Sequence, residues 1–261
     1  MKPQNIEKPM PALLWFHGGG FVVGDAEGEL RDLVQISQVL GVVVVSVDYR
    51  LAPEHPYPAA VEDGYAALRW ICEDPVDLNI DPARVAVGGL SAGGCLAAAM
   101  TLMSRDLSGP PICFQVLDSP VIDDRLQTPS MREFTDTPNW SRTNAEISWN
   151  AYLGSDRNGG APPFAAPARE PDLRGLPPAY VTACEFDPLR DEAIEYAQRL
   201  VQAGVPVELH MYPGTFHGSA AAVAEARVSR LMQEDLRIAL RRAFDAANTM
   251  PISKDDHGRI I

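Results

Sequence analysis

The sequence contains little positive charge and no cluster of basic residues. Only three of its 261 residues are lysines, at positions 2, 8 and 254, and the formal net charge is −13. Nucleic acids and anionic membranes bind proteins through a basic face, which this composition does not supply. We therefore predict that neither a nucleic acid nor a membrane is a partner, and we attribute the acidic balance to solubility.

Long apolar runs are also absent. The first apolar stretch, residues 12–16, is far shorter than the ~20 residues that cross a bilayer, and residues 1–11 are polar and proline-rich, unlike a signal peptide. The cysteines show no C-x-x-C spacing, so we expect neither a disulfide nor a metal site; they are Cys72, Cys95, Cys113 and Cys184. These absences predict a cytoplasmic protein that uses no metal or other cofactor.

No internal repeat or low-complexity linker divides the chain. Hydrophobic residues make up 46% and charged residues 22%, which are ordinary values for a globular protein of this length. Strand-like apolar stretches alternate with helical patterns, an order that indicates right-handed crossovers and a mostly parallel sheet with helices on both faces. The strands are expected at 12–16, 42–47, 84–87, 112–117, 179–184 and 207–212, and the main helices at 29–40, 59–72, 192–203 and 220–247.

Residues 119–168 interrupt this alternation. They are rich in proline and aromatic residues, and helical spacing is found near 144–153. An excursion of this length between sheet elements is typical of a lid or a binding loop. We therefore predict a single α/β domain over 1–261 with an inserted cap at about 119–168; a surface insertion with its own small core is the alternative.

A G-x-S-x-G motif with Ser91 at its centre follows the predicted strand 84–87 and precedes an alanine-rich helical pattern. Strand, sharp turn and helix form the context of a nucleophile elbow. In such a strained turn, side chains at Gly89 or Gly93 are expected to collide with neighbouring backbone. The helix that follows Ser91 also points free N–H groups toward the serine, where an oxyanion can be bound.

Three consecutive glycines follow the predicted strand 12–16, in the run His17-Gly18-Gly19-Gly20. Glycines directly after a strand let backbone N–H groups turn toward a ligand, and the run matches the HGGG oxyanion-hole motif of lipases and esterases. Taken alone, the motif is equally consistent with a flexible glycine loop. We interpret His17 as structural, holding the loop by hydrogen bonding, and not as the catalytic base.

A serine becomes a good nucleophile when a base takes its proton, and a carboxylate orients that base. In hydrolases with a nucleophile elbow the chain order is serine, carboxylate, histidine, each at the carboxyl end of a strand. Ser91, Asp187 and His217 fit this order, because Asp187 follows strand 179–184 and His217 follows strand 207–212. The three residues are therefore predicted to form a catalytic triad.

Other residues compete for two of these positions. His210 lies within the last predicted strand, where we expect it at the surface, whereas His217 lies in a glycine-flanked loop. Glu185 and Asp191 compete with Asp187, but Asp191 falls in the next helix. Pro188 fixes a turn that directs the Asp187 carboxylate toward the sheet edge, which favours Asp187 over Glu185.

Taken together, these motifs resemble the hormone-sensitive-lipase-like branch of the α/β-hydrolases. The matching runs are His17-Gly18-Gly19-Gly20, Tyr49-Arg50-Leu51-Ala52-Pro53-Glu54, Gly89-Leu90-Ser91-Ala92-Gly93-Gly94, Asp187-Pro188-Leu189-Arg190-Asp191-Glu192 and Phe216-His217-Gly218. The resemblance implies the α/β-hydrolase fold and hydrolysis of small carboxylic esters through an acyl-enzyme. It also implies an oxyanion hole of backbone N–H groups, here those of Gly18, Gly19 and Ala92.

Two features depart from that family. Leu90 stands before the nucleophile where many members have aspartate, and this change is expected to reshape the floor of the site. Members also have a longer segment before HGGG, which supplies further strands. In this sequence only Met1 to Met10 precede the first strand. In the family's sheet order, strand 42–47 would then be an uncovered edge, which favours a more open acyl pocket and a partner such as a second copy in a homodimer.

The sequence therefore predicts a cofactor-free carboxylesterase for short-acyl esters. Two alternatives share the scaffold: an amide or carbamate hydrolase, and a non-catalytic small-molecule receptor, which the presence of His217 disfavours. Predicted substrate-contacting residues are apolar side chains near the motifs: Phe21, Leu90, Phe134, Trp140, Trp149 and Phe216.

Overall fold

The computed structural model describes residues 9–73, 78–154 and 160–246. Its strands are β1 (Met10–Phe16), β2 (Val43–Val47), β3 (Ile80–Leu90), β4 (Phe114–Asp118), β5 (Ala179–Phe186) and β6 (Val207–Phe216). All neighbouring pairs are parallel, and the order across the sheet is β2-β1-β3-β4-β5-β6. This is the α/β-hydrolase fold that the motifs predicted, and β2 lies at the edge as expected.

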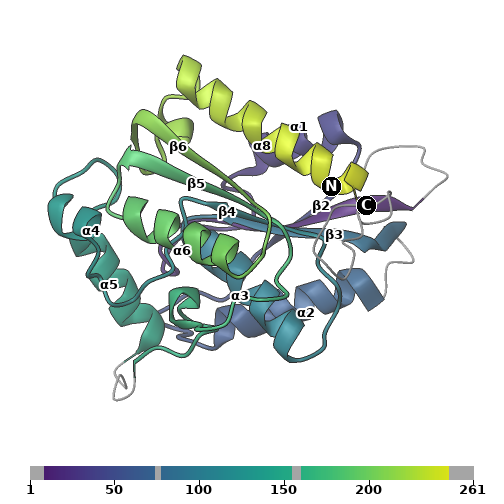
Figure 1. Cartoon of the computed structure of the whole chain (residues 1–261), viewed down its shortest axis with the longest axis horizontal. Helices are drawn as coiled ribbons and strands as arrows, with labels where there is room; N and C mark the ends of the chain where they lie inside the picture. Colours follow the sequence, from purple (N-terminus) through teal and green to yellow (C-terminus); the bar gives the residue numbers. More distant parts are fainter. Residues whose placement is uncertain (1–8, 74–77, 155–159, 247–261) are drawn as a thin grey trace.

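Helices connect the strands and cover both faces of the sheet (Figure 1). They are α1 (Leu30–Leu40), α2 (Ala59–Glu73), α3 (Ala92–Asp106), α4 (Pro129–Glu133), α5 (Arg142–Leu153), α6 (Arg190–Gln202), α7 (Ser219–Ala222) and α8 (Arg227–Ala246), with a 3₁₀ turn at Pro167–Arg169. The prediction of one continuous helix over 220–247 was wrong. The chain leaves the helical conformation at Val223 and forms two helices, α7 and α8.

Side chains alternate between the two faces of the sheet, as the pleat of a strand requires. Leu14 and Phe16 of β1 join the large core beneath α2, α3 and α6. Leu13 and Trp15 join a second core beneath α1 and α8. Near-continuous apolar strands such as Val43–Val47 are explained by this double coverage, since both faces of a parallel sheet are buried.

The parallel arrangement brings the loops with functional motifs to one edge of the sheet. The carboxyl end of β1 leads into 17–20, that of β3 into Ser91, that of β5 into Asp187 and that of β6 into His217. Residues nearly 200 positions apart in the chain are therefore neighbours in space.

The region between β4 and β5 contains α4 and α5, which lie beyond the carboxyl ends of the strands (Figure 1). Helix α5 begins with a capping box of Ser141 and Asn144. Its buried face holds Trp149 and Tyr152, and the Tyr152 ring stacks on Phe21 with centroids 3.9 Å apart. The inserted region thus shares the main core and is fixed to the body of the domain.

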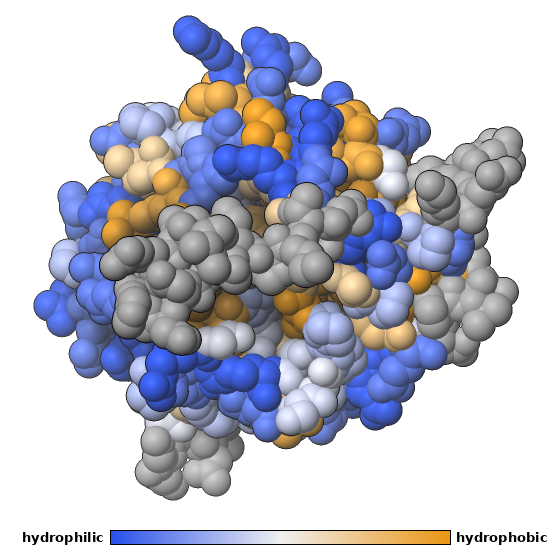
Figure 2. Space-filling model, turned by 45° about the vertical axis from the view of Figure 1, so that its right-hand side comes forward, coloured by the Kyte–Doolittle hydropathy of each residue, from blue (hydrophilic) through white to orange (hydrophobic). Residues whose placement is uncertain are grey.

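The face drawn in Figure 2 is mostly hydrophilic, with hydrophobic residues in small separate groups. That distribution agrees with the acidic composition. Among the helices of the described residues, none has the length and apolar character that crossing a membrane requires.

Candidate active site

Ser91 occupies a strained turn between β3 and α3. Its φ of 58° and ψ of −116° lie in a region that non-glycine residues rarely adopt. A Cβ added at Gly93 would collide with the carbonyl of Phe16, and one at Gly89 would collide with the backbone of Gly93. The two motif glycines are therefore required for the close approach of β1, β3 and α3, as predicted.

His217 lies between Ser91 and Asp187. Its Nε2 is 2.9 Å from the Ser91 Oγ, and its Nδ1 is 2.8 Å from an Asp187 carboxylate oxygen. The other Asp187 oxygen accepts the Leu189 N–H at 2.9 Å. The structure thus brings together the three residues that the sequence predicted, each with its side chain almost fully buried.

The surroundings of His217 set its proton affinity. Burial alone would lower the pKa of the imidazole, but the charge and hydrogen bond of Asp187, with a smaller contribution from Asp118, outweigh burial and raise the pKa above 6.5. An imidazole with a carboxylate on Nδ1 and a hydroxyl on Nε2 is oriented to take the hydroxyl proton and to stabilise the resulting positive charge.

The competing residues have other partners. Glu185 accepts the Gly214 N–H, and Asp191 accepts the Ser130 N–H at 2.7 Å. His210 Nε2 is 2.7 Å from a Glu208 carboxylate oxygen, and the His210 ring packs against Tyr180 with centroids 5.3 Å apart. The choice of Asp187 and His217 over these residues therefore agrees with the geometry.

Loop 17–20 is held by contacts on several sides. The His17 Nδ1 is 2.7 Å from the Gly18 carbonyl oxygen, and the His17 ring stacks on Tyr49 with centroids 4.2 Å apart. The Tyr49 hydroxyl donates to the His17 carbonyl oxygen at 2.9 Å. His17 thus has the structural place that the sequence predicted, and burial lowers the pKa of its imidazole.

The predicted oxyanion donors differ in availability. The Gly18 N–H, which the resemblance implied as an oxyanion donor, already donates to the Glu29 carboxylate at 2.9 Å and does not have that role in this structure. Within the described residues, the N–H groups of Gly19, Gly20 and Ala92 make no hydrogen bond. Because buried N–H groups are almost always paired, such unpaired groups beside a nucleophile are suited to an anionic ligand.

A cleft of about 550 Å³ opens onto Ser91 and His217. This volume lies in the range of small-molecule sites. Two of the predicted substrate-contacting residues, Leu90 and Trp140, line it, and the Trp140 ring is 5.7 Å from the His217 ring.

The other four predicted contacts are not found in this cleft. Phe21 and Trp149 are fully buried in the core beneath α5. Phe134 meets Phe186 edge-on, 6.3 Å away, and Arg190 lies over its ring. Phe216 pairs with Phe186 in the β5–β6 ladder and does not line the cleft. These aromatic residues were misassigned because apolar core and apolar pocket have the same sequence signature.

Several residues of the cleft were not predicted from the sequence. Val23 and Ile147 are exposed apolar side chains in its lining, and Ser148 lies deeper. Asn139 has a φ of 68°, and its side-chain amide donates to the His217 carbonyl oxygen at 3.1 Å. Asparagine adopts the left-handed region more readily than most residues, so its presence can indicate such a turn. Nothing in the sequence, however, places Asn139 beside His217.

Among the described residues, no group of three or more His, Cys, Asp or Glu side chains is arranged to hold a metal ion. The residues that converge here are instead a serine, a histidine hydrogen-bonded to it, an aspartate on the far side of the histidine, and unpaired N–H groups. This set is suited to acyl transfer through a covalent intermediate.

Comparison with known proteins gives three kinds of similarity. A family described as "alpha/beta hydrolase fold" matches residues 13–221. "Esterase LipI" of Mycobacterium tuberculosis is 44% identical over 216 residues, 83% of this chain and 67% of the relative. "Ethyl acetate hydrolase" of Pseudomonas putida is 35% identical over 211 residues, 79% of this chain and 65% of the relative. The solved structure "Bacterial Heroin Esterase" superposes with a TM-score of 0.91 at 51% identity, covering 93% of this chain and 78% of the other.

Proposed function

We propose a substrate class and a mechanism for this chain, which belongs to the alpha/beta hydrolase fold family. It is a carboxylesterase, as the proteins with 44% and 51% identity to it are named esterases. The finer proposal is that it hydrolyses small esters with short acyl chains, and that Ser91, His217 and Asp187 carry the reaction.

The observation that carries the mechanism is the pair of hydrogen bonds on His217, 2.9 Å to Ser91 and 2.8 Å to Asp187. His217 Nε2 takes the proton as the Ser91 Oγ forms a bond to the ester carbonyl carbon. His217 then gives that proton to the leaving alcohol, and an acyl-enzyme remains. Water, deprotonated by the same imidazole, releases the carboxylic acid and restores Ser91.

The charge that develops on the carbonyl oxygen requires hydrogen-bond donors. Ala92 N–H is at the first turn of α3, where the helix dipole favours a negative charge. Gly19, on the loop after β1, lines the cleft, and neither of these two N–H groups makes a hydrogen bond within the described residues. We assign these two N–H groups to the oxyanion hole, each worth about 3–4 kcal/mol of transition-state stabilisation.

The fixed cap supports a small substrate. Helix α5 is tied to the core by Trp149 and Tyr152, which favours a fixed wall of the cleft over a lid that opens toward a lipid surface. Val23, Ile147 and Trp140 give the cleft apolar walls for the acyl and alcohol groups. A relative with 35% identity is named an ethyl acetate hydrolase, which agrees with short acyl chains.

The test is release of p-nitrophenol from acetyl through palmitoyl esters. Wild-type protein is expected to act on the short esters, with activity falling as the acyl chain lengthens. Ser91→Ala is expected to lower kcat by roughly 10⁶-fold, as for other serine hydrolases. Ser148→Ala, which changes another serine of the same cleft, is the matched control and is expected to retain activity.

A folded wild type that is inactive on every ester would contradict the proposal, as would equal activity of Ser91→Ala. Matched ester and amide substrates distinguish the ester reaction from amide or carbamate hydrolysis, because an amine leaving group needs stronger protonation.

A further inference from the structure

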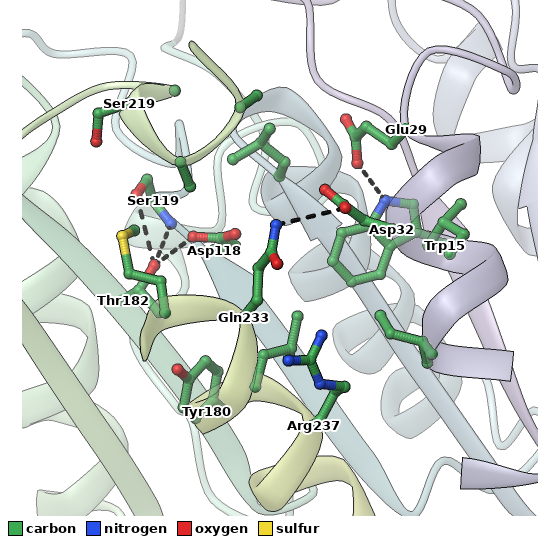
Figure 3. Close-up of a pocket in the computed structure, with 18 of the residues that line it drawn as sticks. Trp15, Glu29, Asp32, Asp118, Ser119, Tyr180, Thr182, Ser219, Gln233 and Arg237 are labelled. Carbon is green, nitrogen blue, oxygen red and sulfur yellow. Dashed lines mark hydrogen bonds between the residues drawn. The ribbon is translucent and has the colours of Figure 1, made fainter. Parts of the chain in front are cut away.

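Glu29 connects loop 17–20, which we call the oxyanion loop, to the end of β1. One carboxylate oxygen accepts the Gly18 N–H at 2.9 Å, and the other accepts the Trp15 Nε1–H at 2.5 Å. Figure 3 shows Glu29 above the Trp15 ring, with this second hydrogen bond drawn. Trp15 lies near the end of β1 and Gly18 on the loop that follows it, so one carboxylate holds both the strand end and the loop.

The position of Glu29 in its helix is unusual for its residue type. It is the N-cap of α1, where a short polar side chain normally accepts an N–H of the first helical turn. The Glu29 side chain makes no such capping bond and reaches instead to Gly18 and Trp15. A local rule broken in this way points to a role outside the helix.

The contact determines how the next peptide group lies. Gly18 N–H is held by Glu29, and the Gly18 carbonyl oxygen is held by His17. In a trans peptide the carbonyl and the following N–H point in opposite directions, so the Gly19 N–H points away from His17. With both sides of Gly18 fixed, the direction of the Gly19 donor is fixed as well.

Glu29 also lies in the lining of two cavities. It lines the cleft that contains Ser91, and it lines a smaller cavity of about 100 Å³ between the sheet, α1 and α8 (Figure 3). Asp118 and Asp32 lie on the wall of that second cavity. Burial raises the pKa of Glu29, these two carboxylates add to the rise, and the two N–H donors oppose it. The groups that favour the charged form of Glu29 are therefore the N–H of Gly18 in the oxyanion loop and the Nε1–H of Trp15 in β1.

We propose that Glu29 is a positioning residue for ester hydrolysis, which orients the Gly19 oxyanion donor through its carboxylate bridge between Gly18 and Trp15. This inference rests on the function proposed above and adds a residue to it. In this role Glu29 acts through Gly18 and not on the reacting atoms.

Glu29→Gln tests the bridge because it keeps the shape of the side chain but leaves one acceptor oxygen for two donors. The kcat for p-nitrophenyl acetate is expected to fall at least about 10-fold, within the 10²–10³-fold limit set by loss of a whole oxyanion donor. KM is expected to change less than about twofold. Glu27→Gln, an exposed carboxylate on the same loop, is the matched control and is expected to match the wild type.

Two further readouts distinguish positioning from a loss of folding. Binding of a trifluoromethyl ketone, which forms an oxyanion on Ser91, is expected to weaken in parallel with kcat/KM. The double variant Glu29→Gln, Trp15→Phe lacks the tryptophan donor, so the single glutamine oxygen can accept the Gly18 N–H. Part of the kcat that Glu29→Gln loses is therefore expected to return. A purely structural role predicts additive damage instead.

The outcomes separate the two claims. A wild type that loses ester hydrolysis on Ser91→Ala, but keeps full kcat and ketone binding on Glu29→Gln, overturns the role of Glu29 alone. Additive loss in the double variant, or loss in Glu29→Gln that appears only in KM, also overturns it. A wild type without ester hydrolysis overturns the proposed function and this inference together.

Discussion

His217 is buried beside the Asp187 carboxylate, and this arrangement links its proton affinity to its proposed role. In the proposed mechanism the imidazole must be neutral to accept the Ser91 proton, while Asp187 and, more weakly, Asp118 favour its charged form. The acid limb of the kcat/KM profile, which reports the free enzyme, is therefore expected above pH 6.5, the ordinary pKa of histidine.

Asp187→Asn tests this link. Removing the carboxylate charge lowers the pKa of His217, so the acid limb is expected to move to lower pH than in the wild type. At the same time kcat is expected to fall by about 10⁴-fold, because an asparagine no longer stabilises the correct tautomer or the imidazolium. The measurement is a pH series of kcat/KM for p-nitrophenyl acetate.

An acid limb that stays in place in Asp187→Asn would show that another group controls it. The double variant Ser91→Ala, Asp187→Asn gives the background rate, so that slow hydrolysis outside the triad is not counted.

The sequence was sufficient to predict the place of some residues in the site but not of others. Ser91 and His217 could be placed because glycine motifs and strand order mark them. Glu29 could not, since its role depends on a hydrogen bond to Gly18 that no spacing rule encodes. Trp140 and Trp149 are both tryptophans of the inserted region, yet one lines the cleft and the other is core. Their local sequence does not separate these environments.

The nucleophile elbow is an element whose geometry depends on backbone packing. β1, β3 and α3 meet at Gly89 and Gly93, where there is no room for a side chain. The strand, the turn and the start of the helix could be predicted together, because each requirement is local and leaves a glycine in the sequence. The helical spacing near 144–153 predicted α5, but the contacts of this region with Phe21 and His217 could not be predicted, since they are long-range.

Gly93→Ala is expected to destabilise this element. The added methyl group would collide with the Phe16 carbonyl, so β1 or α3 must shift. The expected cost is about 1–3 kcal/mol, as for other overpacked sites, with a fall in Tm of several degrees and reduced kcat.

Gly28→Ala is the control for Gly93→Ala, because its added methyl group would meet its nearest neighbour, the Asp25 carbonyl oxygen, at an ordinary 3.6 Å. Thermal unfolding and ester hydrolysis measured side by side compare the two. Equal Tm values for both variants would contradict the packing argument.

The whole molecule is stabilised by two cores, one on each face of the sheet. α1 and α8 cover the face that holds Trp15 and Tyr180, and Leu240 of α8 is fully buried there. The parallel sheet and its double coverage were predictable from continuous apolar strands separated by helices. The break between α7 and α8 was not, because the sequence from 219 to 246 has no proline or glycine to mark it.

Leu240→Ala is expected to lower the free energy of unfolding by about 2–5 kcal/mol, because it leaves a cavity beneath α8. Ile238→Ala on the same helix is the control: its side chain is 43% exposed, and its effect is expected within about 0.5 kcal/mol. Urea unfolding gives both values. A Leu240→Ala variant as stable as Ile238→Ala would mean that α8 contributes little to the second core.

Covalent labelling tests whether Ser91 is the nucleophile of a serine esterase. Diethyl p-nitrophenyl phosphate reacts with an activated serine: the Oγ–P bond forms, p-nitrophenolate leaves, and the phosphoryl group stays on the protein. Peptide mass spectrometry is expected to find one diethylphosphoryl group per chain, on Ser91, and none in Ser91→Ala or His217→Ala after the same exposure. If the folded wild type carries no adduct, or carries it on another residue, Ser91 is not the nucleophile.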